Sequence, residues 1–134
     1  MRQAPLTILL VEDERIIALS LEVLIRKLGH RVGATVVSGE AALAALESVR
    51  PDLVLMDIHL EGALDGIETA RRIRELGGPP LAYATAYTDP ETRARAQSTE
   101  PLGFLSKPVS PEDIRSLIDR LPPAAQSALS TTAL

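Results

Sequence analysis

A short apolar run that ends in an acid, Leu53-Val54-Leu55-Met56-Asp57, constrains the fold of this chain more than any other stretch. Four apolar residues in a row are typical of a strand that is buried on both faces of a parallel sheet. The carboxylate of Asp57 is then expected at the carboxyl edge of that sheet. Because ligands of open parallel sheets bind in the crevice outside this edge, Asp57 is a candidate for chemistry.

Continuous hydrophobic runs alternate along the chain with segments in which hydrophobic residues recur at helical spacing. This alternation predicts five strands and five helices. The strands are expected at residues 6–11, 31–37, 53–56, 81–85 and 102–106, and the helices at residues 15–28, 38–49, 65–76, 89–98 and 110–121. Right-handed crossovers between such strands form a parallel sheet, so we expect a doubly wound α/β domain with helices on both faces.

Local signals mark the ends of the predicted helices. Gly29 stands where a left-handed C-cap is common, and Asp65 and Glu68 are spaced like a capping box. Ser110 is expected to cap the last helix. The helix at residues 89–98 is expected to bury little area, because its apolar residues are alanines.

The predicted helix at residues 15–28 has one apolar line through Ile17, Leu21, Leu24 and Leu28. A second line runs through Ala18, Leu21 and Ile25. This line could broaden the core or form a dimer face, and we interpret it as core.

Length and composition bound the class of protein. The 134 residues suit one domain, expected at residues 1–121, followed by a tail or truncated linker at residues 122–134, where no core pattern remains. Only Tyr83, Tyr87 and Phe104 are aromatic, so the core must be aliphatic. The net charge of −4 comes from interleaved acids and bases, which favours neither direct nucleic-acid binding nor a polybasic membrane surface.

Targeting and redox signals are also absent from the sequence. The chain has no cysteine, which excludes a disulfide framework and a thiolate metal site. A membrane span needs roughly 20 apolar residues, and no stretch approaches this length. Because Met1 leads straight into a strand without a signal-peptide core, we expect a soluble cytoplasmic protein.

Polar side chains stand at the carboxyl ends of four predicted strands. They are Glu12 and Asp13 after the first strand, Asp57 after the third, Thr85 at the end of the fourth and Lys107 after the fifth. Because these ends share one edge of a parallel sheet, the side chains can converge there. Carboxylates this close repel one another unless cations lie between them, so we expect two positive partners, Lys107 and a divalent metal. All-oxygen ligands without cysteine or paired histidine favour Mg²⁺ or Mn²⁺.

Such a site can transfer a phosphoryl group. A carboxylate can attack phosphorus to form an acyl phosphate, while a metal ion and a lysine neutralise charge on the transferred group. Asp57 is the best nucleophile because it ends the central strand, and Glu12 and Asp13 are better placed to hold the metal. The Thr85 hydroxyl could then donate a hydrogen bond to the phosphoryl oxygens.

These residues resemble the receiver domain of two-component response regulators, of the chemotaxis-regulator type. The motifs that match in order and spacing, between Leu6 and Leu121, are Val11-Glu12-Asp13-Glu14, Leu55-Met56-Asp57, Asp65-Gly66, Thr85-Ala86 and Lys107-Pro108. The resemblance implies a flavodoxin-like fold with sheet order 2-1-3-4-5. It also implies a signalling domain that catalyses only its own phosphorylation and dephosphorylation.

The resemblance assigns a role to each site residue. It implies that Asp57 takes a phosphoryl group from a histidine kinase or phosphotransfer protein, that Lys107 pairs with this group and that Thr85 moves to contact it. The implied Mg²⁺ ligands are Asp13 and Asp57 directly, Glu12 through water and the backbone carbonyl of His59. Phe104 matches the aromatic switch position. The implied partners downstream are an effector or output domain, or a second copy in a phosphorylation-dependent homodimer.

Two departures from the family pattern stand out. Glu61 replaces the usual proline after Asp57, and the loop to Asp65-Gly66 is one residue longer than the commonest spacing, so an altered loop conformation is expected. The stretch Leu102-Gly103-Phe104 lacks the acidic pair that many DNA-binding regulators use in receiver dimers. This argues against a standard transcription factor.

Three other interpretations compete with this function. The strand-end charges could be a structural ion-pair cluster, or the domain could be a docking module that works without phosphorylation. A metal-dependent phosphohydrolase with an aspartyl nucleophile is the third, but it usually needs a second acid shortly after the nucleophile, and Ile58, His59 and Leu60 supply none. The side chains of His30 and His59 are expected to face solvent rather than to bind metal.

Overall fold

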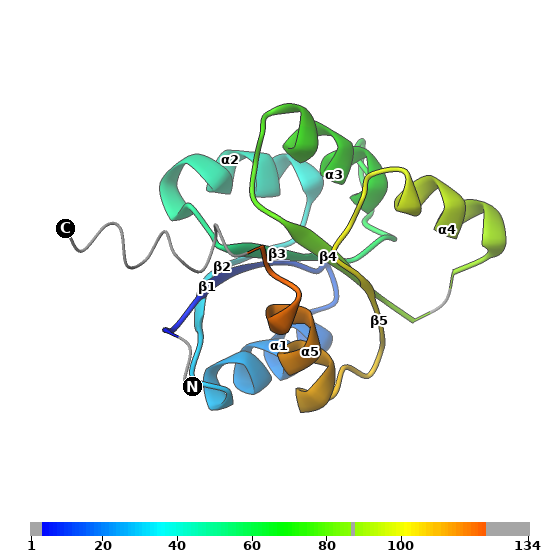
Figure 1. The fold of residues 1–134 in the computed structure, drawn as a ribbon. Coiled ribbons are helices and arrows are strands. Elements are labelled where there is room, and N and C mark those ends of the chain that lie inside the picture. The colour runs from blue at the N-terminus through cyan, green and yellow to red at the C-terminus, as the bar shows by residue number, and fades with distance from the viewer. Residues whose placement is uncertain (1–3, 87, 123–134) are drawn as a thin grey trace.

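A computed structural model describes residues 4–86 and 88–122 as one sheet between two layers of helices (Figure 1). The strands are β1 (Thr7–Val11), β2 (Arg31–Val36), β3 (Leu53–Met56), β4 (Leu81–Thr85) and β5 (Phe104–Ser106), and the helices are α1 (Arg15–Lys27), α2 (Gly39–Val49), α3 (Gly66–Glu75), α4 (Pro90–Gln97) and α5 (Pro111–Asp119). The predicted alternation of strands and helices is confirmed, with ends that coincide or shift by one or two residues.

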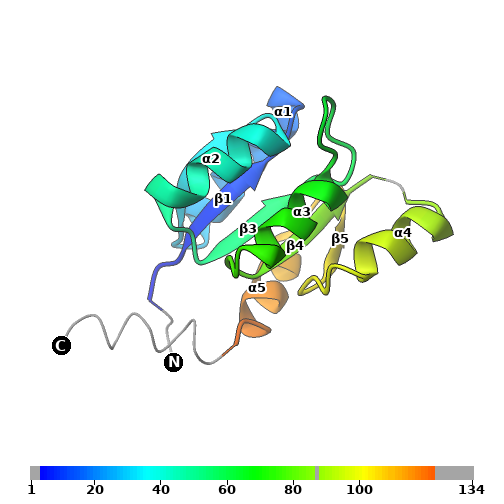
Figure 2. The ribbon, with the colours of Figure 1, turned by 90° about the horizontal axis from the view of Figure 1, so that it is seen from above.

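The sheet has the predicted order, β2-β1-β3-β4-β5, and every neighbouring pair is parallel. Helices α1 and α5 cover one face, and α2, α3 and α4 cover the other (Figures 1 and 2). This arrangement is a doubly wound, flavodoxin-like α/β fold. It brings the carboxyl ends of all five strands to one edge of the sheet.

Two aliphatic clusters pack against the two faces of the sheet. Ala18, Leu21 and Ile25 of α1 are buried, so their interpretation as core residues is confirmed. On the other face, Tyr83 is completely buried, and its hydroxyl lies 2.7 Å from the Thr99 hydroxyl. Pairing the phenol with a hydroxyl avoids the cost of burying an unsatisfied polar group.

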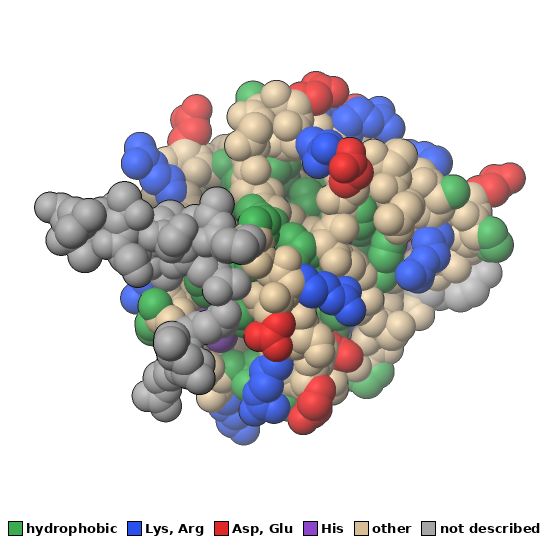
Figure 3. All heavy atoms as spheres, in the orientation of Figure 1, with side chains coloured by type: hydrophobic (Ala, Val, Ile, Leu, Met, Phe, Trp, Pro, Cys, Tyr) green, Lys and Arg blue, Asp and Glu red, His purple; other side chains and the backbone are tan. Residues whose placement is uncertain are grey.

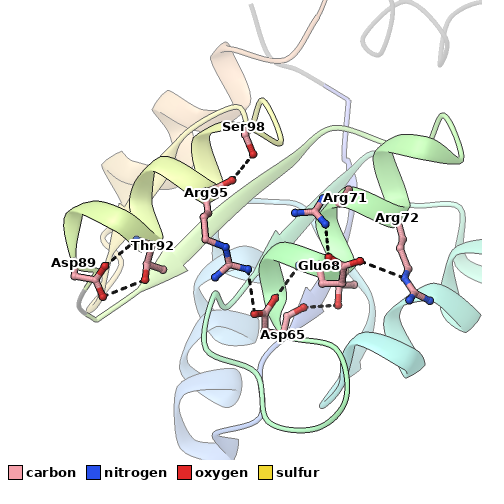
Figure 4. A network of polar contacts seen from close by, with 9 residues as sticks. Asp65, Glu68, Arg71, Arg72, Asp89, Thr92, Arg95 and Ser98 are labelled. Carbon is pink, nitrogen blue, oxygen red and sulfur yellow. Dashed lines mark hydrogen bonds and ion pairs between the residues drawn. The ribbon is translucent and has the colours of Figure 1, made fainter.

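The predicted helix starts are confirmed, but one capping box is only half formed. Asp65 accepts a hydrogen bond from the Glu68 N–H at 2.8 Å, whereas the Glu68 carboxylate turns away to Arg71 at 2.6 Å (Figure 4). At α5 the box is complete, because Ser110 and Asp113 each accept a hydrogen bond from the other's backbone N–H.

Helix α4 buries little area, as its alanine-rich sequence predicts. Ala96 is its only buried residue. Arg95 reaches from α4 toward Asp65 at the start of α3, with 3.7 Å between nitrogen and oxygen (Figure 4). The guanidinium of Arg93 lies 4.1 Å from the centre of the Phe104 ring, which adds a cation–π contact.

On the face drawn in Figure 3, acids and bases lie side by side, as the interleaved sequence predicts. Within residues 4–86 and 88–122, no helix combines the length and the apolar character needed to cross a bilayer. The predicted tail at residues 122–134 lies, apart from Pro122, outside the described residues.

The expectation that the His30 side chain faces solvent is wrong. The ring is half-buried, and its Nδ1 accepts a hydrogen bond from the Leu6 N–H at 3.0 Å. The backbone N–H at the start of β1 needs an acceptor, and the imidazole supplies it. Burial lowers the pKa of His30 below its ordinary value, because it disfavours the charged form of the ring.

We expect the stability of the protein to fall as the pH drops below the ordinary pKa of histidine, 6.5. In that range the unfolded chain takes up a proton that folded His30 resists, so the contribution present above this pH is lost as the pH falls. Urea unfolding at about pH 7.5 and about pH 5.5 measures the effect. His30→Asn keeps an acceptor oxygen without a titrating ring, and should lose less stability between the two pH values. An equal loss in both proteins would contradict this role.

Candidate functional site

The predicted site residues lie together at the carboxyl edge of the sheet. Glu12 and Asp13 follow β1, Asp57 follows β3, Thr85 ends β4 and Lys107 follows β5. Backbone hydrogen bonds extend the sheet just beyond the strands: the Asp57 N–H donates to the Val11 carbonyl at 3.0 Å. The Lys107 N–H donates to the Thr85 carbonyl, also at 3.0 Å. These backbone hydrogen bonds therefore fix the main-chain positions from which the Asp57 and Lys107 side chains extend.

Three carboxylates form the centre of this site. Oxygen atoms of Glu12, Asp13 and Asp57 all lie within 4.8 Å of one another. Glu12 is 2% exposed and Asp57 is 6% exposed, while Asp13 is half-buried. Acids at this degree of burial need charged or hydrogen-bonding partners.

Lys107 is the cation of the cluster. Its Nζ lies 2.6 Å from a Glu12 oxygen and 3.5 Å from an Asp57 oxygen. The lysine therefore binds Glu12 more closely than Asp57, the predicted nucleophile. When all four groups are ionised, three negative charges face one positive charge, which leaves two negative charges without a partner in the cluster.

Both oxygens of the Glu12 carboxylate already have hydrogen-bond donors. One accepts from Lys107 at 2.6 Å, and the other accepts from the Glu14 N–H at 3.1 Å. Burial raises the pKa of Glu12 above its ordinary value, and the hydrogen bonds from Lys107 and Glu14 oppose this shift. A carboxylate held in this way is suited to contact a metal ion through a water molecule.

The donor set fits a hard divalent cation. Carboxylate oxygens are ligands that Mg²⁺ and Mn²⁺ prefer, and the excess negative charge of the cluster favours a cation there. Asp13 and Asp57 are better placed than Glu12 to bind the cation directly, because Glu12 is already paired with Lys107.

The loop after β3 begins at the site. The His59 N–H donates to an Asp57 oxygen at 3.1 Å, which keeps the loop backbone beside the carboxylate. The His59 side chain is exposed, as predicted. At the far end, the Gly66 N–H donates to the Ile58 carbonyl at 3.0 Å, so the first residue of α3 packs directly on the residues after β3.

Thr85 and Phe104 occupy neighbouring strands on the side of the site toward α4. Thr85 is buried at the end of β4 and pairs in register with Ser106 of β5, one residue before Lys107. The Phe104 ring is half-buried and stacks on Tyr83, with 5.5 Å between the ring centres and an angle of 28° between the planes. Phe104 thus lies among the side chains that hold α4.

Sequence reasoning missed the partners of Phe104. The family pattern marks position 104, but no local signal in the sequence pairs it with Tyr83 of β4 or with Arg93 of α4. An arginine on a charged helix ordinarily indicates a solvated face, and only the packing of α4 beside β5 places its guanidinium over the ring.

Comparison with known proteins identifies the family. Residues 8–119 match the response regulator receiver domain. This chain belongs to that family. The receiver is 35% identical over 114 residues to the phyllosphere-induced regulator PhyR of Methylorubrum extorquens, across 84% of this chain and 42% of that protein. It is 43% identical over 83 residues to the transcriptional regulatory protein AfsQ1 of Streptomyces coelicolor, across 62% of this chain and 36% of that protein.

A solved receiver structure agrees with the fold. The signal receiver domain of a modulated diguanylate cyclase from Desulfovibrio desulfuricans G20 superimposes with a TM-score of 0.84 at 36% identity, and the match covers 90% of this chain and 96% of that one. The present receiver spans about two fifths of the length of the two curated relatives above. It is a domain of two-component signalling rather than a classical enzyme, and its family implies phosphorelay signalling and Mg²⁺.

Proposed function

We propose that Asp57 is the phosphoacceptor of this receiver and that phosphorylation switches its surface to control a downstream effector or output domain. The observation that carries the proposal is the cluster itself: the buried Asp57 carboxylate, with two further carboxylates within 4.8 Å and the Lys107 ammonium at 3.5 Å. A plain ion-pair cluster would balance its charges, whereas this one has an excess of acids. The donor would be a histidine kinase or a phosphotransfer protein.

The transfer is an in-line displacement. An Asp57 oxygen attacks the phosphorus of a phosphohistidine, the new O–P bond forms as the P–N bond breaks, and the leaving imidazole takes up a proton. Lys107 pairs with the oxygens of the transferred group. Mg²⁺, held by Asp13, Asp57, the His59 carbonyl and Glu12 through water, would supply further positive charge. Attack of water on the acyl phosphate would return the receiver to its starting state.

The proposed switch involves Thr85 and Phe104. The Thr85 hydroxyl would move to donate a hydrogen bond to the phosphoryl group and make room for the Phe104 ring to change its packing against Tyr83. Because Arg93 of α4 contacts the same ring, this change would reach the surface formed by α4, β5 and α5. The new charge would bias an existing equilibrium between two conformations.

We place the receiver at residues 1–121 and treat residues 122–134 as a tail or linker. Its location would be the cytoplasm, its output would act through a protein partner or an attached domain rather than through direct contact with nucleic acid or membrane, and a second copy of the phosphorylated receiver is a candidate partner.

Chemical phosphorylation tests the proposal. The protein is incubated with Mg²⁺ and a small phosphodonor, and the intact mass is measured. We expect one phosphoryl group that is stable in acid and labile in base, as an acyl phosphate is, and that maps to the peptide containing Asp57. Chelation of the metal should prevent its formation. No adduct would favour a docking module that works without phosphorylation, and turnover of a phosphoester would favour a phosphohydrolase.

A further inference from the structure

The loop between β3 and α3 carries the two departures noted in the sequence, Glu61 and one additional residue before Asp65-Gly66. Its middle residues, Glu61, Gly62 and Ala63, are exposed, whereas Leu60 and Leu64 on either side are buried. Two leucine side chains therefore hold the ends of the exposed stretch against the domain. The backbone between them needs separate contacts to keep one conformation.

One of these contacts joins the loop to a proposed metal ligand. The Glu61 N–H donates a hydrogen bond to an Asp13 oxygen at 3.3 Å. A proline at this position has no N–H and could not make the bond. The residue that replaces the usual proline therefore orients the Asp13 carboxylate, which keeps its other oxygen for a cation.

The second contact joins the loop to α2. A Glu40 oxygen accepts a hydrogen bond from the Leu64 N–H at 3.2 Å. The neighbouring Gly39 lies so close to the loop that a methyl group there would be 2.9 Å from the Leu64 Cβ and would overlap the Thr69 hydroxyl. The start of α2 is thus packed against the end of the loop, with Glu40 as its polar attachment.

We propose that Glu40 is a positioning residue for the Mg²⁺ site. It binds no metal itself, but it holds the loop so that the Glu61 N–H meets Asp13 and the His59 backbone stays beside Asp57. The inference has two halves. The metal half, that Glu40 positions the Mg²⁺ site, rests on the proposed function. The loop half, that Glu40 holds the loop, rests on the contacts of Leu64 and Glu61 alone. What Glu40 supplies is a hydrogen-bond acceptor, so a neutral amide oxygen should replace it.

Amide hydrogen exchange of the metal-free protein tests the loop half. In Glu40→Ala, the Leu64 amide should exchange about three- to tenfold faster than in the wild type, because its acceptor is gone. Glu40→Gln keeps an acceptor oxygen and should exchange within about twofold of the wild type. Glu47→Ala, an exposed acid farther along α2, is the matched control. Unchanged exchange in Glu40→Ala would overturn the attachment.

Calorimetric titration with Mg²⁺ tests the metal half. We expect the dissociation constant of Glu40→Ala to rise about three- to tenfold, while Glu40→Gln and Glu47→Ala stay within about twofold of the wild type. Equal affinity in Glu40→Ala and the wild type would overturn the positioning role. A weakening in Glu40→Gln as large as in Glu40→Ala would show that charge, and not the hydrogen bond, matters. If the wild type bound no Mg²⁺, the metal half and the proposed function would fail together, while the exchange data would still decide the loop half.

Discussion

Asp57→Asn is expected to reduce phosphoryl incorporation to background. An amide is not a nucleophile toward phosphorus, and no other acid of the cluster ends the central strand. The fold should persist, because the amide oxygen of asparagine can still accept the hydrogen bond from the His59 N–H, which Asp57 accepts at 3.1 Å. The variant also removes one negative charge from a cluster in which three acids face one lysine. Without Mg²⁺ it should therefore be at least as stable as the wild type. Intact mass after phosphodonor treatment measures the first effect, and urea unfolding the second.

Asp52→Asn is the matched control for this variant. Asp52 stands at the other end of β3, where it accepts a hydrogen bond from the Thr7 N–H at 2.8 Å, far along the strand from the proposed phosphoacceptor. This change should leave phosphorylation intact and lower stability by about 1 kcal/mol, as expected when a charged hydrogen bond is weakened. Phosphoryl incorporation by Asp57→Asn at the level of the wild type would show that another residue accepts the phosphoryl group.

Gly66→Ala is expected to lower the free energy of unfolding by about 3 kcal/mol or more. Gly66 is the first residue of α3 and is buried against the residues after β3. A methyl group there would overlap the Asp57 carbonyl oxygen and lie 2.8 Å from the Ile58 Cα. These are backbone atoms that no side-chain rotation can move, so relief requires a shift of α3 or of β3. Urea unfolding followed by far-ultraviolet circular dichroism measures the loss.

Gly103→Ala separates this steric effect from a general cost of replacing glycine. A methyl group at position 103 would lie 2.7 Å from the end of the Arg120 side chain, which is exposed and is held only by a long hydrogen bond, 3.4 Å, to the Leu102 carbonyl, so it can move aside. We expect a change within about 0.5 kcal/mol. Similar losses in the two variants would mean that the contact between α3 and the Asp57 backbone is not as close as described.

Local patterns explain why so much of the fold was predictable. The buried run before Asp57 identifies a central parallel strand, and Ser110 with Asp113 identifies the start of α5, because periodicity and caps act within a few residues. The half-formed box at Asp65 shows the limit of such signals. Glu68 had the right spacing, but the arginine one turn later competes for its carboxylate, and spacing alone does not decide between two partners.

Some residues that shape the site could not be found from the sequence. Glu40 is one acid among several on helix surfaces, and nothing near it in the sequence indicates that it meets the Leu64 N–H. The sequence predicts a surface position for His30, and only the fold brings its Nδ1 to the Leu6 N–H. In both cases the partner is 24 residues away in the sequence.

Short-range patterns of buried strands and helix caps were enough to predict the alternation of strands and helices, and with it the acids and the lysine at the strand ends. The pairing of these groups came from the fold: Lys107 lies 2.6 Å from Glu12 and 3.5 Å from Asp57, Arg93 lies over Phe104, and the loop after β3 is attached to Asp13 and Glu40. Such pairings depend on the directions of side chains from segments far apart in the chain, and these directions are set by packing rather than by local sequence.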